Sequence, residues 1–120
     1  MAAHLTQHLI SGSTSGRGIK VNATSTAGDL IHTAVAGAAD FDRIWLEVRN
    51  SSAAVVRLTV EWGGATVPDD VTYYDVPAAG EGPYEVEAGR LLNGGLVVRA
   101  FAATADVLTI SGRVTRSDAA

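Results

Sequence analysis

The sequence predicts an all-β protein: a single-domain antiparallel β-sandwich or jelly roll of about eight strands with a flexible N-terminal arm. Short runs rich in β-forming residues alternate with clusters of Gly, Pro, Asp, Asn and Ser, which is typical of sandwiches and barrels. No segment shows helical periodicity. With 120 residues, of which 47% are hydrophobic, the chain is long enough for one domain with a core and too short for two.

Residues 1–17 are expected to form the arm. Leu5, Leu9 and Ile10 are too few to form a core of their own, yet they are apolar enough to fill grooves on another protein. We therefore expect them, together with Arg17, to become ordered by docking on a partner. The glycines of the run SGSTSGRG (residues 11–18) would act as a hinge. Deleting residues 2–16 would then leave the stability of the sandwich nearly unchanged.

The same Gly-Ser run could be taken for a phosphate-binding loop. A P-loop needs two glycines separated by four residues and then Lys followed by Ser or Thr. Gly12 and Gly16 are separated by three residues, and Arg17 stands where the lysine would be. A β-forming segment follows, whereas phosphate loops lead into a helix. The sequence therefore predicts no nucleotide site and no cofactor.

The sandwich is expected over residues 18–116, and the polar tail 117–120 is expected to fray. Turn signals divide this region, among them the segment 77–83, the Asn-Gly-Gly at 93–95 and Asp106 before the last strand. The predicted strands, in chain order, are Gly18–Thr24, Asp29–Ala34, Asp42–Asn50, Ala54–Trp62, Val71–Val76, Tyr84–Ala88, Leu96–Ala102 and Val107–Thr115.

The third and fourth predicted strands alternate most clearly. Ile44, Leu46 and Val48 share one face of the first, and Leu58 and Val60 share the corresponding face of the second. A hairpin through the loop 51–53 would bring these faces together. The same register would place Glu47 opposite Arg57 and Arg43 opposite Glu61, as two cross-strand ion pairs.

Residues that point away from this core are candidates for contacts with other molecules. Trp62 falls on the core side, whereas Trp45 falls on the outer face, where a neighbouring subunit, a bound sugar or the protein's own loops could cover it. The Gly-rich loop 63–70 is long enough to project from the sheet. The expected subunit-interface residues are Trp45, Glu47, Arg57, Val67 and Pro68.

The side chains that carry enzyme chemistry form no recognisable set. His4, His8 and His32 are accompanied by neither a nucleophile elbow nor a cluster with metal-ligand spacing. Asp69 and Asp70 could hold calcium with nearby carbonyls, but the usual Asp-rich loop pattern is missing, and Asp in turns generally bonds its own backbone. The sequence therefore predicts no catalytic residue, no metal site and no enzyme activity.

Composition restricts the partners further. The net charge is −4 and the pI is about 5.2, which disfavours nucleic-acid binding because such proteins normally present a basic face. No apolar run approaches the length needed to cross a membrane, and the first ten residues lack the features of a signal peptide. The absence of cysteine excludes disulfides and thiolate metal sites.

Three stretches, IWLEVRNSS (44–52), LTVEWGG (58–64) and LNGGLVVRAFA (92–102), resemble small β-sandwich virion proteins of tailed bacteriophages. The likeness is greatest to capsid decoration (cement) proteins and neighbouring head–tail components, and it covers about residues 18–115. It implies a sandwich or jelly-roll subunit, commonly trimeric, that binds the major capsid protein on the capsid surface of the virion and is assembled in the bacterial host cytoplasm.

Two other functions are compatible with the same residues. A carbohydrate- or receptor-binding module of a phage tail could use Trp45 or the loop 63–70 as a sugar platform. A tail-tube or baseplate component would also need no catalytic residues. The sequence does not separate a capsid position from a tail position.

Overall fold

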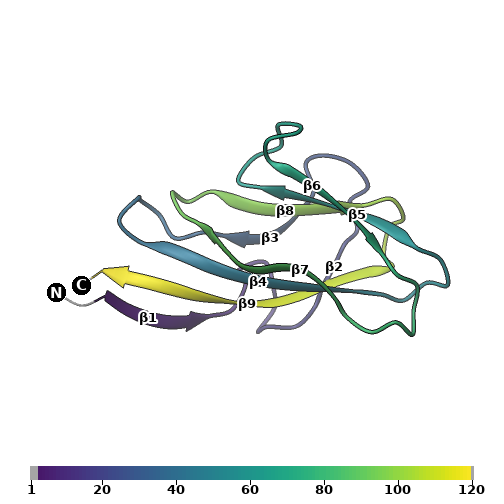
Figure 1. The fold of residues 1–120 in the computed structure, drawn as a ribbon, viewed down its shortest axis with the longest axis horizontal. Coiled ribbons are helices and arrows are strands. Elements are labelled where there is room, and N and C mark those ends of the chain that lie inside the picture. Colours follow the sequence, from purple (N-terminus) through teal and green to yellow (C-terminus); the bar gives the residue numbers. More distant parts are fainter. Residues whose placement is uncertain (1–2, 120) are drawn as a thin grey trace.

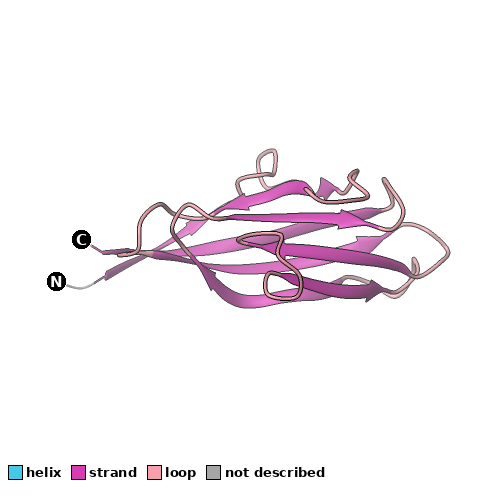
Figure 2. Ribbon diagram, turned by 90° about the horizontal axis from the view of Figure 1, so that it is seen from above, coloured by secondary structure: helices cyan, strands magenta, loops and turns pink. Residues whose placement is uncertain are grey.

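The strands of this protein form two antiparallel sheets that pack face to face, which confirms the predicted all-β sandwich. The structure is a computed structural model that describes the backbone of residues 3–119 and the side chains of residues 5–117. This part of the chain contains nine strands and no helix, and so no helix able to cross a membrane. The molecule is elongated, with extents of 51 × 28 × 21 Å (Figures 1 and 2).

In both sheets, most neighbouring strands are far apart in the sequence. Sheet A has the order β1 (Ala3–His8), β9 (Leu108–Ala119), β4 (Phe41–Asn50), β7 (Tyr84–Leu92), and β2 (Ile19–Lys20) also pairs with β9. Sheet B has the order β3 (Asp29–Thr33), β8 (Val97–Ala102), β5 (Val56–Trp62), β6 (Val71–Val76). Each predicted strand overlaps an observed one. The first shrinks to the two residues of β2, the sixth extends to Leu92 and the last extends to Ala119, while β1 was not predicted as a strand.

The core lies between the sheets and follows the alternation in the sequence. Along β4, Ile44, Leu46 and Val48 are buried, while the residues between them lie on the outer face. β5 presents Leu58 and Val60 to the same interior. Because successive strand residues point to opposite sides, a single alternating run is enough to place a residue inside or outside.

The predicted hairpin between β4 and β5 is wrong. β4 pairs with β7 and β9, whereas β5 pairs with β6 and β8, so the connection 51–55 crosses from one sheet to the other. Neither expected ion pair forms. Arg57 instead lies opposite Asp75, and Glu61 lies opposite Arg99. The alternation fits both arrangements, because two strands that face each other across a core bury the same residues as two strands that pair.

The predicted boundary between a flexible arm and the sandwich is also corrected. Residues 3–8 form β1, which pairs with the C-terminal half of β9, from Ala3 opposite Ala119 to His8 opposite Val114. Ile10 is 1% exposed and belongs to the hydrophobic core, so it is not available to a partner. At the other end, residues 117–119 lie within β9 and do not form a separate tail.

The Gly-Ser run is an ordered turn between β1 and β2. The Gly12 N–H donates to the Ile31 carbonyl, and the Ser13 hydroxyl donates to the Ile10 carbonyl at 2.7 Å. A Cβ at Gly12 would collide with the Leu30 carbonyl oxygen. Gly12 therefore allows the backbone to approach β3 closely, and the sequence interpretation of a hinge missed this use of glycine.

The position of Ile10 leads to a stability prediction. Ile10→Ala should lower the free energy of unfolding by about 2–5 kcal/mol, because it leaves a cavity in a packed core. Leu9→Ala is the matched control, since Leu9 is 59% exposed and its truncation should cost less than about 0.5 kcal/mol. Urea unfolding of both variants measures the difference. If both substitutions lowered the free energy of unfolding by the same small amount, the segment around Ile10 would not contribute to the core.

Candidate functional site

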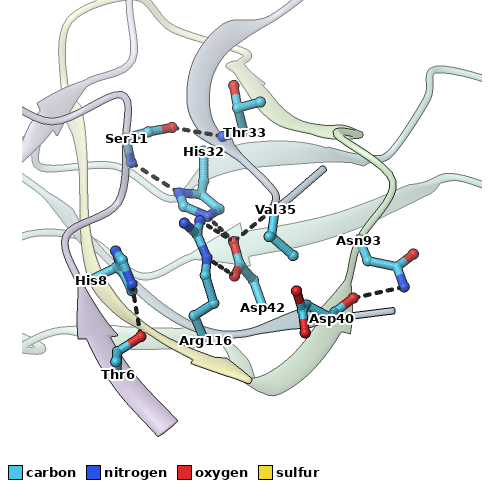
Figure 3. A network of polar contacts seen from close by, with 10 residues as sticks. All are labelled: Thr6, His8, Ser11, His32, Thr33, Val35, Asp40, Asp42, Asn93 and Arg116. Atoms are coloured by element: carbon cyan, nitrogen blue, oxygen red, sulfur yellow. Dashed lines mark hydrogen bonds and ion pairs between the residues drawn. The ribbon is translucent and has the colours of Figure 1, made fainter. Parts of the chain in front are cut away.

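A buried polar network joins three strands and the turn after β1 (Figure 3). His32 on β3 and Asp42 on β4 are both 0% exposed, and their Nε2 and Oδ2 atoms are 2.7 Å apart. Arg116 on β9 donates to both carboxylate oxygens of Asp42, from Nε at 2.6 Å and from Nη2 at 3.0 Å. The Val35 N–H donates to the same carboxylate at 3.1 Å.

The hydrogen bonds fix the tautomer of His32. Its Nδ1 accepts the Ser11 N–H at 2.9 Å, so Nδ1 carries no proton. Nε2 then carries the proton and donates it to Asp42, which is the arrangement of a neutral imidazole. The Ser11 hydroxyl does not face the ring, because it accepts the Thr33 N–H at 2.7 Å.

The surroundings of Asp42 stabilise its charged form. Burial alone would raise the pKa of this carboxyl, but the hydrogen bonds and charges of Arg116 and His32 outweigh burial and hold its pKa below the ordinary value of 3.8. His, Asp and Ser residues thus lie together here, but only the backbone N–H of Ser11 contacts the ring, so the arrangement differs from the side-chain triad of some hydrolases. The ring is wholly buried and both its nitrogens are engaged, so this network holds segments of the chain together and offers no surface to a substrate.

A second buried carboxylate, Glu87, lies on β7. Burial raises its pKa despite the opposing charge of Arg90, whose Nη1 is 3.3 Å from Glu87 Oε2. The Arg90 guanidinium also lies over the Trp62 ring, 4.6 Å from its centre. Burial together with the charge of Glu87 raises the pKa of Tyr74, whose hydroxyl donates to the Val86 carbonyl at 2.7 Å. This cluster links the edge strands β6 and β7 of the two sheets.

The outer face of sheet A carries Trp45 and a shallow groove. The Arg113 guanidinium lies 4.3 Å from the centre of the Trp45 ring, and a Cβ at Gly89 would lie 3.4 Å from two ring atoms. Trp45 is therefore half-buried by the neighbouring strands β9 and β7, and not by loops. The groove has a volume of about 390 Å³ and is lined by Trp45, Leu46, Glu47, Glu85, Ser111, Gly112 and Arg113.

Like charges face each other in this groove. Glu47 lies opposite Glu85 across the β4–β7 ladder and accepts the Ser111 hydroxyl at 3.3 Å. Arg49 is 3.6 Å from Glu47 on the exposed side. No group of three His, Cys, Asp or Glu residues with metal-binding geometry occurs among the described side chains. The groove is therefore polar and open, without a ligand set of its own.

The outer face of sheet B carries an apolar cluster, which we call the sheet-B patch: Val67, Val71, Tyr73 and Phe101. Tyr73, Thr59 and Phe101 lie in one cross-strand row over β6, β5 and β8. Val67 reaches the same place from the loop 63–70 and is 63% exposed, and Tyr73 is 52% exposed. These side chains border a hollow of about 230 Å³, whose lining also includes Thr24, Ser25 and Thr26.

Two carboxylates hold the loops around the patch in place. Glu61 on β5 is 2% exposed and accepts the Gly28 N–H at 2.7 Å and the Thr26 hydroxyl. Asp70 accepts the Thr66 N–H at 3.1 Å across the base of its own loop. Asp70 therefore bonds its own backbone, which is the alternative to calcium binding that the sequence left open. Both loops are anchored to the sheet, so the patch is preformed.

The structure divides the predicted interface residues between two faces. Trp45 and Glu47 lie on sheet A. Arg57, Val67 and the exposed Pro68 lie on the sheet-B side, with the Arg57 guanidinium 5.6 Å from the centre of the Tyr73 ring. Of the predicted docking residues, Leu5, Leu9 and Arg17 are exposed, while Ile10 is buried.

Sequence reasoning missed Asp42, Arg116 and Glu61. The sequence does indicate that Asp42 is buried, because Asp42 shares the inward face of one alternating run with Ile44, Leu46 and Val48. A charged residue at an inward position needs a buried partner. The burial of Glu61 has no such signal, since it depends on a loop that folds over the outer face.

The comparisons with known proteins gave no match, whether with family models, curated proteins or solved structures.

The network around Asp42 predicts a pH-dependent effect. Asp42→Asn should cost about 3–5 kcal/mol at pH 7, because it removes the buried charge that accepts the hydrogen bonds of Arg116, His32 and the Val35 N–H. In the wild type the lowered pKa of Asp42 means that the unfolded chain takes up the proton first as the pH falls. The stability from Asp42 is thus present above about pH 4 and lost as the pH falls through the folded-state pKa.

Urea unfolding from pH 7 to pH 2.5 tests this. The difference in the free energy of unfolding between wild type and Asp42→Asn should become smaller below about pH 4. Asp75→Asn is the control, because Asp75 pairs with Arg57 at the exposed surface and its loss should have little effect. A gap that stays constant over the whole pH range would contradict the assignment of the charge to Asp42.

Proposed function

We propose that this chain is a non-enzymatic structural protein of a tailed-phage virion. In this proposal it is a decoration (cement) subunit that binds the lattice of the major capsid protein, associates with copies of itself as a trimer and stabilises the head. The observation that carries the proposal is the sheet-B patch, an apolar surface on a rigid face of the sandwich. The resemblance of residues 18–115 to phage virion proteins supplies the identity of the partner.

The patch has the properties of a protein-binding surface. Val67 and Tyr73 are more than half exposed, and they adjoin the partly buried Val71 and Phe101, so burial by a partner would remove apolar area from water. Aromatic residues and arginine are enriched in interfaces, and Tyr73 with Arg57 above its ring provides both. Anchored loops reduce the entropy that binding would cost.

A lattice partner fits a surface of this size. One small apolar patch gives modest affinity when it acts alone. A trimer would present three copies to a repeating lattice, and the simultaneous contacts would raise the overall affinity without a stronger single contact. Stabilisation of the head would then follow from binding across neighbouring capsid subunits.

A tail position with a carbohydrate-binding role is the second candidate. The hollow beside Tyr73 combines two aromatic residues, Tyr73 and Phe101, with the hydroxyl-bearing residues Thr24 and Ser25, a combination of residue types that can bind a sugar. Trp45 is a weaker platform than the sequence suggests, because Arg113 already stacks on its ring. A tail-tube or baseplate component would use the same patch for a protein neighbour.

Binding to phage heads tests the proposal. Undecorated heads assembled from the cognate major capsid protein are mixed with the purified protein, and bound protein is measured after sedimentation. Val67→Asp and Tyr73→Ala should each weaken binding at least tenfold, which corresponds to about 1.4 kcal/mol. Val55→Asp is the matched control, because Val55 is also 63% exposed but does not border the hollow.

The same samples separate the alternatives. All three variants should keep the wild-type thermal midpoint, and light scattering should report a trimer. Wild-type protein that does not bind heads but binds oligosaccharides on a glycan array would replace the capsid proposal by the carbohydrate-binding one. Equal binding by wild type and the two patch variants would show that another surface makes the contact.

A further inference from the structure

We propose that β1 is a pairing surface for a second copy of this chain. Two β1 strands would meet edge to edge and antiparallel across a two-fold axis, joining two copies of sheet A into one continuous sheet. This contact goes beyond the proposed function, and it uses neither the sheet-B patch nor the groove at Trp45.

β1 is an open edge strand. It pairs with β9 along one edge through a regular six-residue register, and no other strand of the described chain pairs with its second edge. Every second N–H and C=O group of such a strand points outward and can pair with another strand. The strand AHLTQH contains no proline, lysine or acidic residue and no bulge, which are the devices that usually protect an edge.

The other long edges are protected. β7 has two register shifts against β4, and Gly89, which has a φ of +87°, lies in the first of them. The outward carbonyl of Ile31 on β3 is already bonded to the Gly12 N–H. β6 carries Asp75 in an ion pair with Arg57, and its Tyr74 hydroxyl bonds β7. Of the longer edge strands, β1 is the one left regular and uncharged.

The position of β1 leaves room for a neighbour. β1 and the end of β9 extend beyond the body of the sandwich, as both ribbon views show (Figures 1 and 2). Leu5, near the middle of β1, is 73% exposed. A second strand can therefore approach the edge without displacing a loop, and it would cover an apolar side chain that water now surrounds.

The pattern of β1 favours a second copy over an unrelated strand. Residues directly opposite each other in an antiparallel sheet share a face. In the joined sheet, the outward-facing side chains of both copies must lie on the same face. The registers that meet this condition include Leu5 opposite Leu5 of the second copy and Leu5 opposite its Gln7. Apolar meets apolar or an uncharged amide in these registers, and no like charges face each other within the strand.

The absence of cysteine provides a direct test. A single Leu5→Cys substitution introduces the only thiol, so a disulfide can form only between two copies. Directly opposite Cα atoms in antiparallel strands lie about 4.5–5.5 Å apart, within the range that a disulfide spans. Mild oxidation of Leu5→Cys, or of a mixture with Gln7→Cys, should give covalent dimers much faster than oxidation of the control Val55→Cys, since Val55 is 63% exposed and Leu5 is 73% exposed.

Denaturing gels read the cross-link whether or not trimers form through other surfaces, so a failure here leaves the capsid proposal intact. Dimer yields from Leu5→Cys and from its mixture with Gln7→Cys that do not exceed those from Val55→Cys would overturn the pairing of β1.

A charge at the same position gives a second, independent readout. Leu5→Lys should weaken the two-fold pairing of copies, seen in sedimentation experiments as association beyond the trimer, at least tenfold, because it introduces like charges at the edge, whereas Val55→Lys should not. The fold should be unaffected, since Leu5 is exposed, and an unchanged thermal midpoint in dilute solution verifies this. A wild-type protein with no such association up to about 1 mM, or a Leu5→Lys variant that pairs as well as wild type, would refute the proposal.

Discussion

The buried carboxylate of Asp42 connects more of this protein than any other single group in its network. It receives hydrogen bonds from His32 on sheet B and from Arg116 on sheet A, so it joins the two layers of the sandwich. Through the second nitrogen of His32 it also holds Ser11, and with it the turn that follows β1. Removal of a carboxylate from water is costly, and here several donors offset that cost in one place. The ends of β3 and β4 and the N-terminal segment are thus fixed relative to one another.

The second buried carboxylate shows how much the number of donors matters. Glu87 has a raised pKa because burial outweighs the single contact with Arg90, whereas the donors around Asp42 reverse that balance. The two groups therefore act on stability in opposite directions. The contribution of Asp42 is lost in acid, and the ionisation of Glu87 disfavours the folded state as the pH rises through its raised pKa. The combined contribution of these two groups to stability is therefore greatest where Asp42 is charged and Glu87 is still partly protonated.

The local pattern of the sequence predicts the fold class, the strand positions and the inward faces, because each depends on neighbouring residues alone. It does not predict which strand pairs with which. Leu46 and Leu58 are buried whether β4 and β5 form a hairpin or face each other across the core, and the charge pattern around Glu47 and Arg57 favoured the wrong choice. The sequence places Ile10 in an arm because Leu5, Leu9 and Ile10 are too few to form a core, yet the burial of Ile10 depends on strands far along the chain.

The candidate surfaces follow the same rule. Val67 and Arg57 could be assigned to the outside from alternation and loop composition, but their meeting with Tyr73 and Phe101 depends on the order of strands in sheet B. Similarly, the alternation places Trp45 outside, while the stacking of Arg113 on its ring requires β9 beside β4. Exposure is a local property of the chain, whereas the composition of a surface is a property of the topology.

The pairing of β1 with β9 also has a consequence for biosynthesis. Ala3 lies opposite Ala119, so β1 is synthesised long before the strand with which it pairs. During translation β1 and the apolar Ile10 must therefore wait while β3 to β8 are synthesised, and the core position of Ile10 stays incomplete until β9 arrives. Contacts between such distant residues form slowly because a long loop must close. The nascent chain thus exposes β1 as an unpaired strand until β9 has been made, a period in which chaperones could bind it.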